Sequence, residues 1–120
     1  MRLDGRVAVI TGAGSGIGAA SALAMAKEGA RVVVVDLNEA SAKSTVEQIE
    51  KAGGQAVAVR ADVTRAADNQ MVVEKAVATW GRLDVFFANA GVPQWKTSGV
   101  TTIMVSGDTT AVRTMAEMAL

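Results

Sequence analysis

The sequence predicts an α/β fold built on a doubly wound parallel sheet, shortened to about four or five strands. Over residues 1–91, short apolar runs alternate with segments of helical periodicity. The apolar runs are continuous rather than alternating with polar residues, which is typical of parallel strands buried on both faces. The chain has 120 residues, the length of one compact domain, so a single domain is expected over 1–120.

The first strand is expected over Arg6–Ile10, in which every residue after the arginine is apolar. A glycine-rich turn follows, and the first helix is predicted over Ala19–Glu28. Gly29 is its expected end, because glycine readily adopts the left-handed conformation that terminates helices. The second strand is expected over Arg31–Asp36, which contains four consecutive valines and ends on a carboxylate.

Two further helix–strand pairs follow at similar spacing. Asn38 is expected to cap a helix that reaches about Ala52, and Thr64 is expected to cap the next helix, which Gly81 ends. The strands that follow these helices are the apolar runs Gln55–Arg60 and Leu83–Phe87. Helical connections of this length join parallel strands. The pattern therefore predicts a βαβαβαβ unit with the strands side by side.

Residues 92–120 form a divergent tail in which this regularity weakens. The β-branched segment Val100–Val105 predicts a fifth strand, and Thr109–Leu120 predicts a terminal helix. No repeat or low-complexity segment is present in the chain.

Residues Thr11–Gly18 read Thr-Gly-Ala-Gly-Ser-Gly-Ile-Gly and lie between a predicted strand and a predicted helix. Gly12 permits the sharp turn out of the strand, Gly16 leaves room for a pyrophosphate, and Gly18 lets the helix approach the sheet. The free N–H groups of the helix would then face the phosphates. In another context such a turn is only flexible, but here the context is the one that dinucleotide binding requires. The cofactor-binding residues predicted in this Rossmann-like loop are Gly12, Ser15, Gly16, Ile17 and Gly18.

Asp36 is the second indication of a dinucleotide. It ends the second strand 18 residues after Gly18, where a carboxylate can accept hydrogen bonds from the adenosine ribose. Its charge would repel a 2′-phosphate, and the loop around Ser15 carries no Arg or Lys to neutralise one. The sequence therefore predicts NAD rather than NADP as the cofactor. The alternative is that Asp36 merely begins a loop, as aspartate often does.

These residues resemble the short-chain dehydrogenase/reductase family over about residues 3–91. The resemblance rests on the glycine-rich loop, on Asp62-Val63 after the third strand, and on Asn89-Ala90-Gly91 after the fourth. The family's usual Asn-Asn-Ala-Gly is here Ala-Asn-Ala-Gly. The resemblance implies that Asp62 and Val63 lie against the adenine, and that Asn89, Ala90 and Gly91 steady the sheet and border the ribose. For Asp62, a role as a turn or cap residue is the alternative.

The resemblance also implies hydride transfer between NAD and an alcohol or carbonyl, with protons handled by a Tyr-x-x-x-Lys pair. The chain has no tyrosine, so no catalytic residue is assigned. The tail admits two matches to the family. Ile103–Gly107 resembles the start of a helix in which Met104 replaces a catalytic asparagine. Gly99–Gly107 instead resembles a late strand, which the composition slightly favours. Lys96 and Asp108 of the tail could in principle act as a general base, but nothing in their spacing singles them out, and we expect them to be ordinary surface charges.

Three functions stay open at this point. The first is the cofactor half of an NAD-dependent oxidoreductase, truncated or internally deleted, whose substrate would require a fuller chain. The second is an NAD-binding module without catalysis, acting as a regulatory or partner subunit. The third is a degenerate product without function, because a shortened sheet can leave an apolar edge exposed.

The composition of the chain gives no indication of nucleic-acid binding, membrane binding or a metal site. Twelve basic residues balance twelve acidic ones, so no nucleic acid or anionic membrane surface is expected as a partner. The chain contains no cysteine and no histidine, and no metal site is predicted. No signal peptide or membrane span is recognised, which leads us to expect a cytoplasmic protein. A homo-oligomer is compatible with the sequence, which does not decide the oligomeric state.

Overall fold

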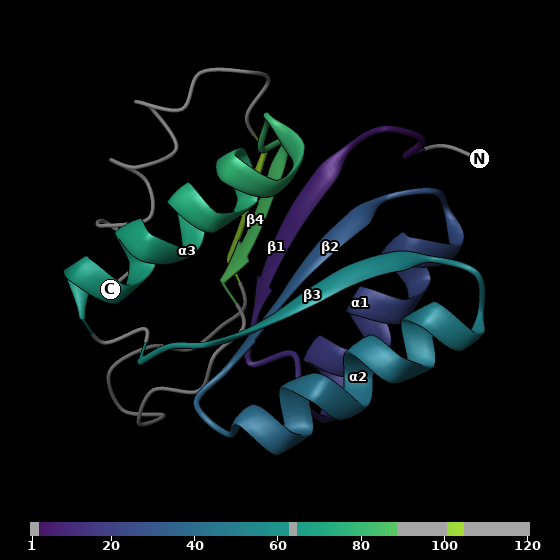
Figure 1. Cartoon of the computed structure of the whole chain (residues 1–120), viewed down its shortest axis with the longest axis horizontal. Coiled ribbons are helices and arrows are strands. Elements are labelled where there is room, and N and C mark those ends of the chain that lie inside the picture. The colour runs from purple at the N-terminus through teal and green to yellow at the C-terminus, as the bar shows by residue number, and fades with distance from the viewer. Residues whose placement is uncertain (1–2, 63–64, 89–100, 105–120) are drawn as a thin grey trace.

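The computed structural model describes residues 3–62, 65–88 and 101–104. They form a five-stranded sheet with helices on both faces (Figure 1). The strands are β1 (Val7–Thr11), β2 (Arg31–Asp36), β3 (Gln55–Arg60), β4 (Val85–Ala88) and β5 (Thr101–Met104). The helices are α1 (Gly16–Lys27), α2 (Glu39–Lys51) and α3 (Ala66–Trp80). None of the helices in this described part of the chain has the length and hydropathy of a membrane span.

The strand order is β3-β2-β1-β4-β5. Strand β1 pairs in parallel with β2 on one side and with β4 on the other, and β2 pairs in parallel with β3. The predicted doubly wound parallel sheet is therefore confirmed for four strands. The predicted fifth strand is also present, and it runs antiparallel to β4. Its direction could not be predicted, because β-branched composition favours a strand of either direction.

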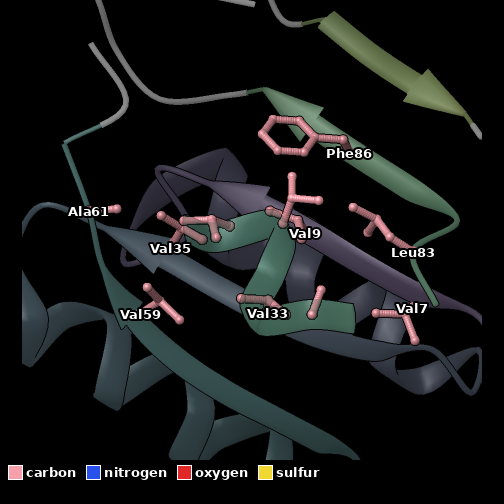
Figure 2. Close-up of a cluster of buried hydrophobic side chains, with 11 residues drawn as sticks. Val7, Val9, Val33, Val35, Val59, Ala61, Leu83 and Phe86 are labelled. Atoms are coloured by element: carbon pink, nitrogen blue, oxygen red, sulfur yellow. The ribbon is translucent and has the colours of Figure 1, made fainter. Parts of the chain in front are cut away.

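The central strands β1 and β2 are buried on both faces of the sheet, which explains their continuous apolar runs. Val33 and Val35 of β2 belong to a buried cluster that includes residues of α3, shown in Figure 2. Val32 and Val34 point to the opposite face and pack with residues of α1 and α2. All four valines are fully buried. Burying each such side chain stabilises the fold by roughly 1.5–3 kcal/mol, so the valine run contributes strongly to the core.

The predicted helix ends are largely confirmed. Gly29 and Gly81 follow α1 and α3 with φ angles of +94° and +77°, which glycine adopts without strain. The Asn38 side chain accepts a hydrogen bond from the Ser41 N–H at 3.1 Å and so caps α2 as predicted. The N-cap of α3 is Arg65 and not Thr64, which itself lies outside the described residues.

The start of α1 differs from the prediction by three residues. The helix begins at Gly16 rather than Ala19, so Gly16 and Gly18 belong to its first turn. The low helix propensity of glycine favoured a later start, but packing overrides propensity here, since Gly18 is buried. In the tail, Ile103 and Met104 lie in a strand, which contradicts the helical match for these two residues. The predicted helix Thr109–Leu120 lies outside the described residues.

A buried carboxylate ties the amino ends of the central strands together. The Val7 N–H donates to Asp84 Oδ2 at 2.9 Å, and the Asp84 N–H donates back to the Val7 carbonyl at 2.9 Å. Arg82 holds both carboxylate oxygens, at 2.7 and 2.8 Å, and Arg6 lies 3.3 Å from Asp84 Oδ1. Burial by itself raises the pKa of Asp84, but the hydrogen bonds from Arg82, Val7 and Arg6 and the positive charge of Arg82 outweigh it. The pKa of Asp84 therefore lies below its ordinary value.

Asp84→Asn is expected to lower the free energy of unfolding at pH 7 by about 1–3 kcal/mol, because charged hydrogen bonds to a buried acceptor are lost. The pKa of Asp84 is lower in the folded state than in the unfolded state. Its contribution is therefore present above the ordinary carboxyl pKa and is lost as the pH falls through the folded value. Urea unfolding at pH 7 and in acid should show the difference between wild type and variant shrinking in acid.

Glu39→Gln is the control, because Glu39 forms an exposed ion pair with Lys43 at 3.1 Å. Its loss should lower the free energy of unfolding by less than about 0.5 kcal/mol. An Asp84→Asn variant that loses no more stability than Glu39→Gln would contradict the structural role of Asp84.

Candidate functional site

The predicted site lies where the chain leaves the centre of the sheet. From the carboxyl end of β1 the chain turns through the glycine-rich loop into α1. The chain runs from β1 to β2 and β3 on one side, whereas β4 lies on the other side of β1. Such a reversal of strand order is the place at which open α/β sheets bind ligands, outside the carboxyl ends of the strands. The loop at Thr11–Gly18 therefore occupies the position that a ligand site requires.

Three hydrogen bonds fasten this loop to β2 and α2. The Ala13 N–H donates to the Val35 carbonyl at 3.0 Å. The Gly14 N–H donates to Asp36 Oδ2 at 2.9 Å. The Thr45 hydroxyl donates to the Ala13 carbonyl at 2.8 Å. The loop is thus held in one conformation by the neighbouring strand and helix.

The first turn of α1 can receive an anion. Its N-cap residue, Ser15, makes no side-chain cap hydrogen bond, and the turn contains no acidic residue. In contrast, Asn38 caps α2, and the first turns of α2 and α3 contain Glu39 and Asp68. The first N–H groups of a helix have no partner within the helix and carry partial positive charge. Among the described helices, α1 therefore offers the amino terminus best suited to a phosphate.

Two glycines of the loop adopt backbone conformations that favour glycine. Gly12 and Gly16 have φ angles of +64° and +59°, a region that other residues rarely adopt. A Cβ built on Gly16 meets no atom of the described chain within 4 Å, so the space beside this glycine is open. Gly18 is buried, in agreement with close packing of helix and sheet. The Ile17 side chain is 69% exposed at the same helix start.

Asp36 is held by two backbone amides. Its Oδ2 accepts from Gly14, and its Oδ1 accepts from the Asn38 N–H at 2.9 Å. The bond to Asn38 forms an Asx turn, so Asp36 does begin the following loop, as the alternative interpretation expected. A carboxylate offers about four acceptor positions, and both oxygens therefore retain capacity for ribose hydroxyls.

Asp62 lies at the same edge of the sheet as Asp36. The Ala61 N–H donates to the Asp36 carbonyl at 3.3 Å and so joins the carboxyl ends of β2 and β3. Asp62 also takes part in the turn before α3, where its carboxylate lies 3.9 Å from Arg65 Nε. The structure thus brings the loop, Asp36 and Asp62 to one edge. The other predicted residues lie outside the described part of the chain: Val63, Asn89, Ala90 and Gly91.

Two residues of this region were not assigned a role from the sequence. A Cβ built on Gly14 would lie 2.6 Å from Ser41 Cβ and 2.7 Å from Asp36 Oδ2, so only glycine fits there. Thr45 is 1% exposed although it is polar. The available signal was its place on α2 between the buried residues Ala42 and Ile49, where a polar side chain needs a partner.

Comparison with known proteins identifies the family. The family model described as short chain dehydrogenase matches residues 6–117. An uncharacterised oxidoreductase of Methylorubrum extorquens is 53% identical over 92 residues, which are 76% of this chain and 37% of that protein. The crystal structure of a hydroxysteroid dehydrogenase from Escherichia coli aligns with a TM-score of 0.74 and 43% identity, over 76% of this chain and 39% of that one.

A third similar protein has a cofactor in its structure. It is a 7α-hydroxysteroid dehydrogenase complexed with NADH and 7-oxo glycochenodeoxycholic acid, which aligns with a TM-score of 0.69 and 42% identity. The match covers 71% of this chain and 33% of that one. This chain therefore spans little more than a third of the length of the relatives that it matches. With a matching family model over most of its length and a Rossmann-like fold, the chain belongs to the short-chain dehydrogenase family.

Proposed function

We propose that this chain binds NAD(H) and forms the cofactor-binding part of an NAD-dependent oxidoreductase. The observation that carries the proposal is the amino terminus of α1. No side chain caps it, its first turn contains no acidic residue, and the space beside its first residue, Gly16, is open. This terminus lies at the carboxyl edge of the sheet, next to a loop that is hydrogen-bonded to Asp36. A pyrophosphate and an adjoining ribose fit that combination of donors and acceptor.

In this proposal each part of the dinucleotide has its own residues. The N–H groups at Gly16–Gly18 would bind the pyrophosphate, and Asp36 would accept from the adenosine ribose. Asp62 and Val63 would lie against the adenine. Residues Asn89, Ala90 and Gly91 would border the ribose. Gly12 and Ser15 would shape the glycine-rich loop. The 7α-hydroxysteroid dehydrogenase complexed with NADH supports this choice of ligand.

Selectivity for NAD over NADP is proposed to come from the charge of Asp36. The carboxylate would face the ribose hydroxyl that bears the extra phosphate in NADP. The negative charges of the Asp36 carboxylate and of that phosphate would then repel each other. The loop Thr11–Gly18 contains no Lys or Arg that could offset the repulsion. Two backbone amides hold the carboxylate in place, which makes it difficult for Asp36 to turn away.

When bound, NADH would donate a hydride to a carbonyl compound, and NAD⁺ would accept one from an alcohol. The residues of this chain would bind and orient the cofactor. Proton transfer in the family requires the Tyr-x-x-x-Lys pair, and no tyrosine occurs in these 120 residues. For the 120 residues themselves, the absence of tyrosine favours a second candidate function, binding of NAD(H) without catalysis.

Calorimetric titration of the 120-residue chain with NADH and with NADPH tests the proposal. We expect NADH to bind with the higher affinity, because only NADPH places a phosphate beside Asp36. Failure of both dinucleotides to bind below millimolar concentration would overturn the proposed function.

Asp36→Asn is expected to narrow the preference for NADH over NADPH by about tenfold or more, because the repelling charge is removed while an acceptor oxygen remains. The matched control is Glu39→Gln, which removes an exposed carboxylate three residues away. The ratio of the two dissociation constants should be unchanged in Glu39→Gln. Equal effects of the two variants would show that general charge, and not the position of Asp36, sets the preference.

The 120-residue chain is expected to show no dehydrogenase turnover with NAD(H) and a panel of alcohols and carbonyl compounds. The physical reason is the missing proton donor, since hydride addition to a carbonyl carbon requires a proton at the carbonyl oxygen. Absorbance of NADH followed over time is a sufficient measurement. Turnover that persists in a repurified sample would contradict the absence of a catalytic group.

A further inference from the structure

Thr45 is a buried polar residue whose hydroxyl serves the glycine-rich loop. It lies in the middle of α2 and is 1% exposed. Its Oγ1 lies 2.8 Å from the Ala13 carbonyl oxygen and 3.4 Å from the Ser41 carbonyl oxygen of its own helix. A hydroxyl has one hydrogen to donate, and the shorter contact has the better geometry for an O–H donor. Thr45 therefore donates to the loop rather than to its own helix.

Thr45 contacts the peptide unit between Ala13 and Gly14, which is hydrogen-bonded at both its carbonyl and its N–H group. The Ala13 carbonyl accepts from Thr45, and the Gly14 N–H of the same peptide donates to Asp36 Oδ2 at 2.9 Å. Because a peptide unit is planar, these two bonds together set its orientation. Hydrogen bonds in such a chain also polarise one another, so donation from Thr45 makes the Gly14 N–H a better donor.

Helix α2 packs directly on this peptide. A Cβ built on Gly14 would lie 2.6 Å from Ser41 Cβ, so the helix approaches the loop as closely as glycine permits. Ser41 and Thr45 are four residues apart and lie on the same face of the helix. The loop is therefore in contact with α2 at two successive turns. Replacing the Thr45 side chain would therefore alter the orientation of the peptide between Ala13 and Gly14, and with it the hydrogen bond from Gly14 to Asp36.

We propose that Thr45 is a positioning residue for the dinucleotide. Through the peptide between Ala13 and Gly14 it orients the glycine-rich loop and the carboxylate of Asp36, although it does not itself reach the cofactor. This inference rests on the proposed function, since it assigns Thr45 a part in the same NAD(H) site. It also makes a claim about the free protein, because both hydrogen bonds of the chain join groups of the protein itself.

The test compares Thr45→Val with Thr45→Ser, of which only the second retains a hydroxyl. In the free protein, Thr45→Val is expected to increase the amide exchange rate of Gly14, measured by NMR, by about fivefold or more. Its dissociation constant for NADH should rise by a similar factor, measured well below the melting temperature of each variant. Thr45→Ser should stay within about twofold of the wild type in both measurements. If Thr45→Val does not fold, Thr45→Ala replaces it.

Thr79→Val is the matched control. The Thr79 hydroxyl donates to the Lys75 carbonyl of its own helix at 2.7 Å, on the exposed surface of α3. Its removal should change neither Gly14 exchange nor NADH affinity. A Thr45→Val variant with a lower melting temperature but unchanged Gly14 exchange and NADH affinity would overturn the proposal. Absence of NADH binding by the wild type would instead overturn the proposed function, and with it the role of Thr45 in cofactor binding.

Discussion

Strand β1 lies at the centre of the sheet, and its burial decides where the neighbouring strands and the glycine-rich loop can lie. This strand pairs with β2 and β4, and every residue of it is buried. Its backbone groups therefore have to be paired with neighbouring strands, which places β2 and β4 on either side of it. At the carboxyl end of β1, between these two neighbouring strands, the glycine-rich loop connects the strand to α1. The candidate site thus has its position because of how the core is built.

The two ends of β1 are held by different chemistry. At the amino end, a buried carboxylate, Asp84, accepts hydrogen bonds from Val7 and from two arginines. At the carboxyl end, the loop is held by the Val35 carbonyl, Asp36 and Thr45. The amino end serves stability, because its ion pairs lie at the opposite end of the strand from the loop. The carboxyl end combines stability with recognition, since Asp36 both holds Gly14 and is the proposed ribose acceptor.

The fold could be predicted because its signals are local. The valines of β2 are continuous because helices cover both faces of the sheet, and that pattern is visible in the sequence. Gly29 and Gly81 end helices because their backbone angles require glycine. The start of α1 was predicted too late because glycine disfavours helix in isolation, whereas burial of Gly18 against the sheet decides the conformation. The direction of β5 has no local signal, because β-branched composition favours a parallel and an antiparallel strand alike.

The amino-acid sequence was enough to predict the order of strands and helices along the chain, the glycine-rich loop and the carboxylate at the end of β2, and it shows that these 120 residues contain no tyrosine. Each of these depends on residue type or on spacing along the chain. Packing of the folded chain brings Thr45 to the Ala13 carbonyl, 32 residues away, and Asp84 to Val7, 77 residues away. A hydrogen bond between distant residues depends on how the helices and strands pack, and no periodicity records it. The partners that hold the loop and the strand therefore became visible only in the folded chain.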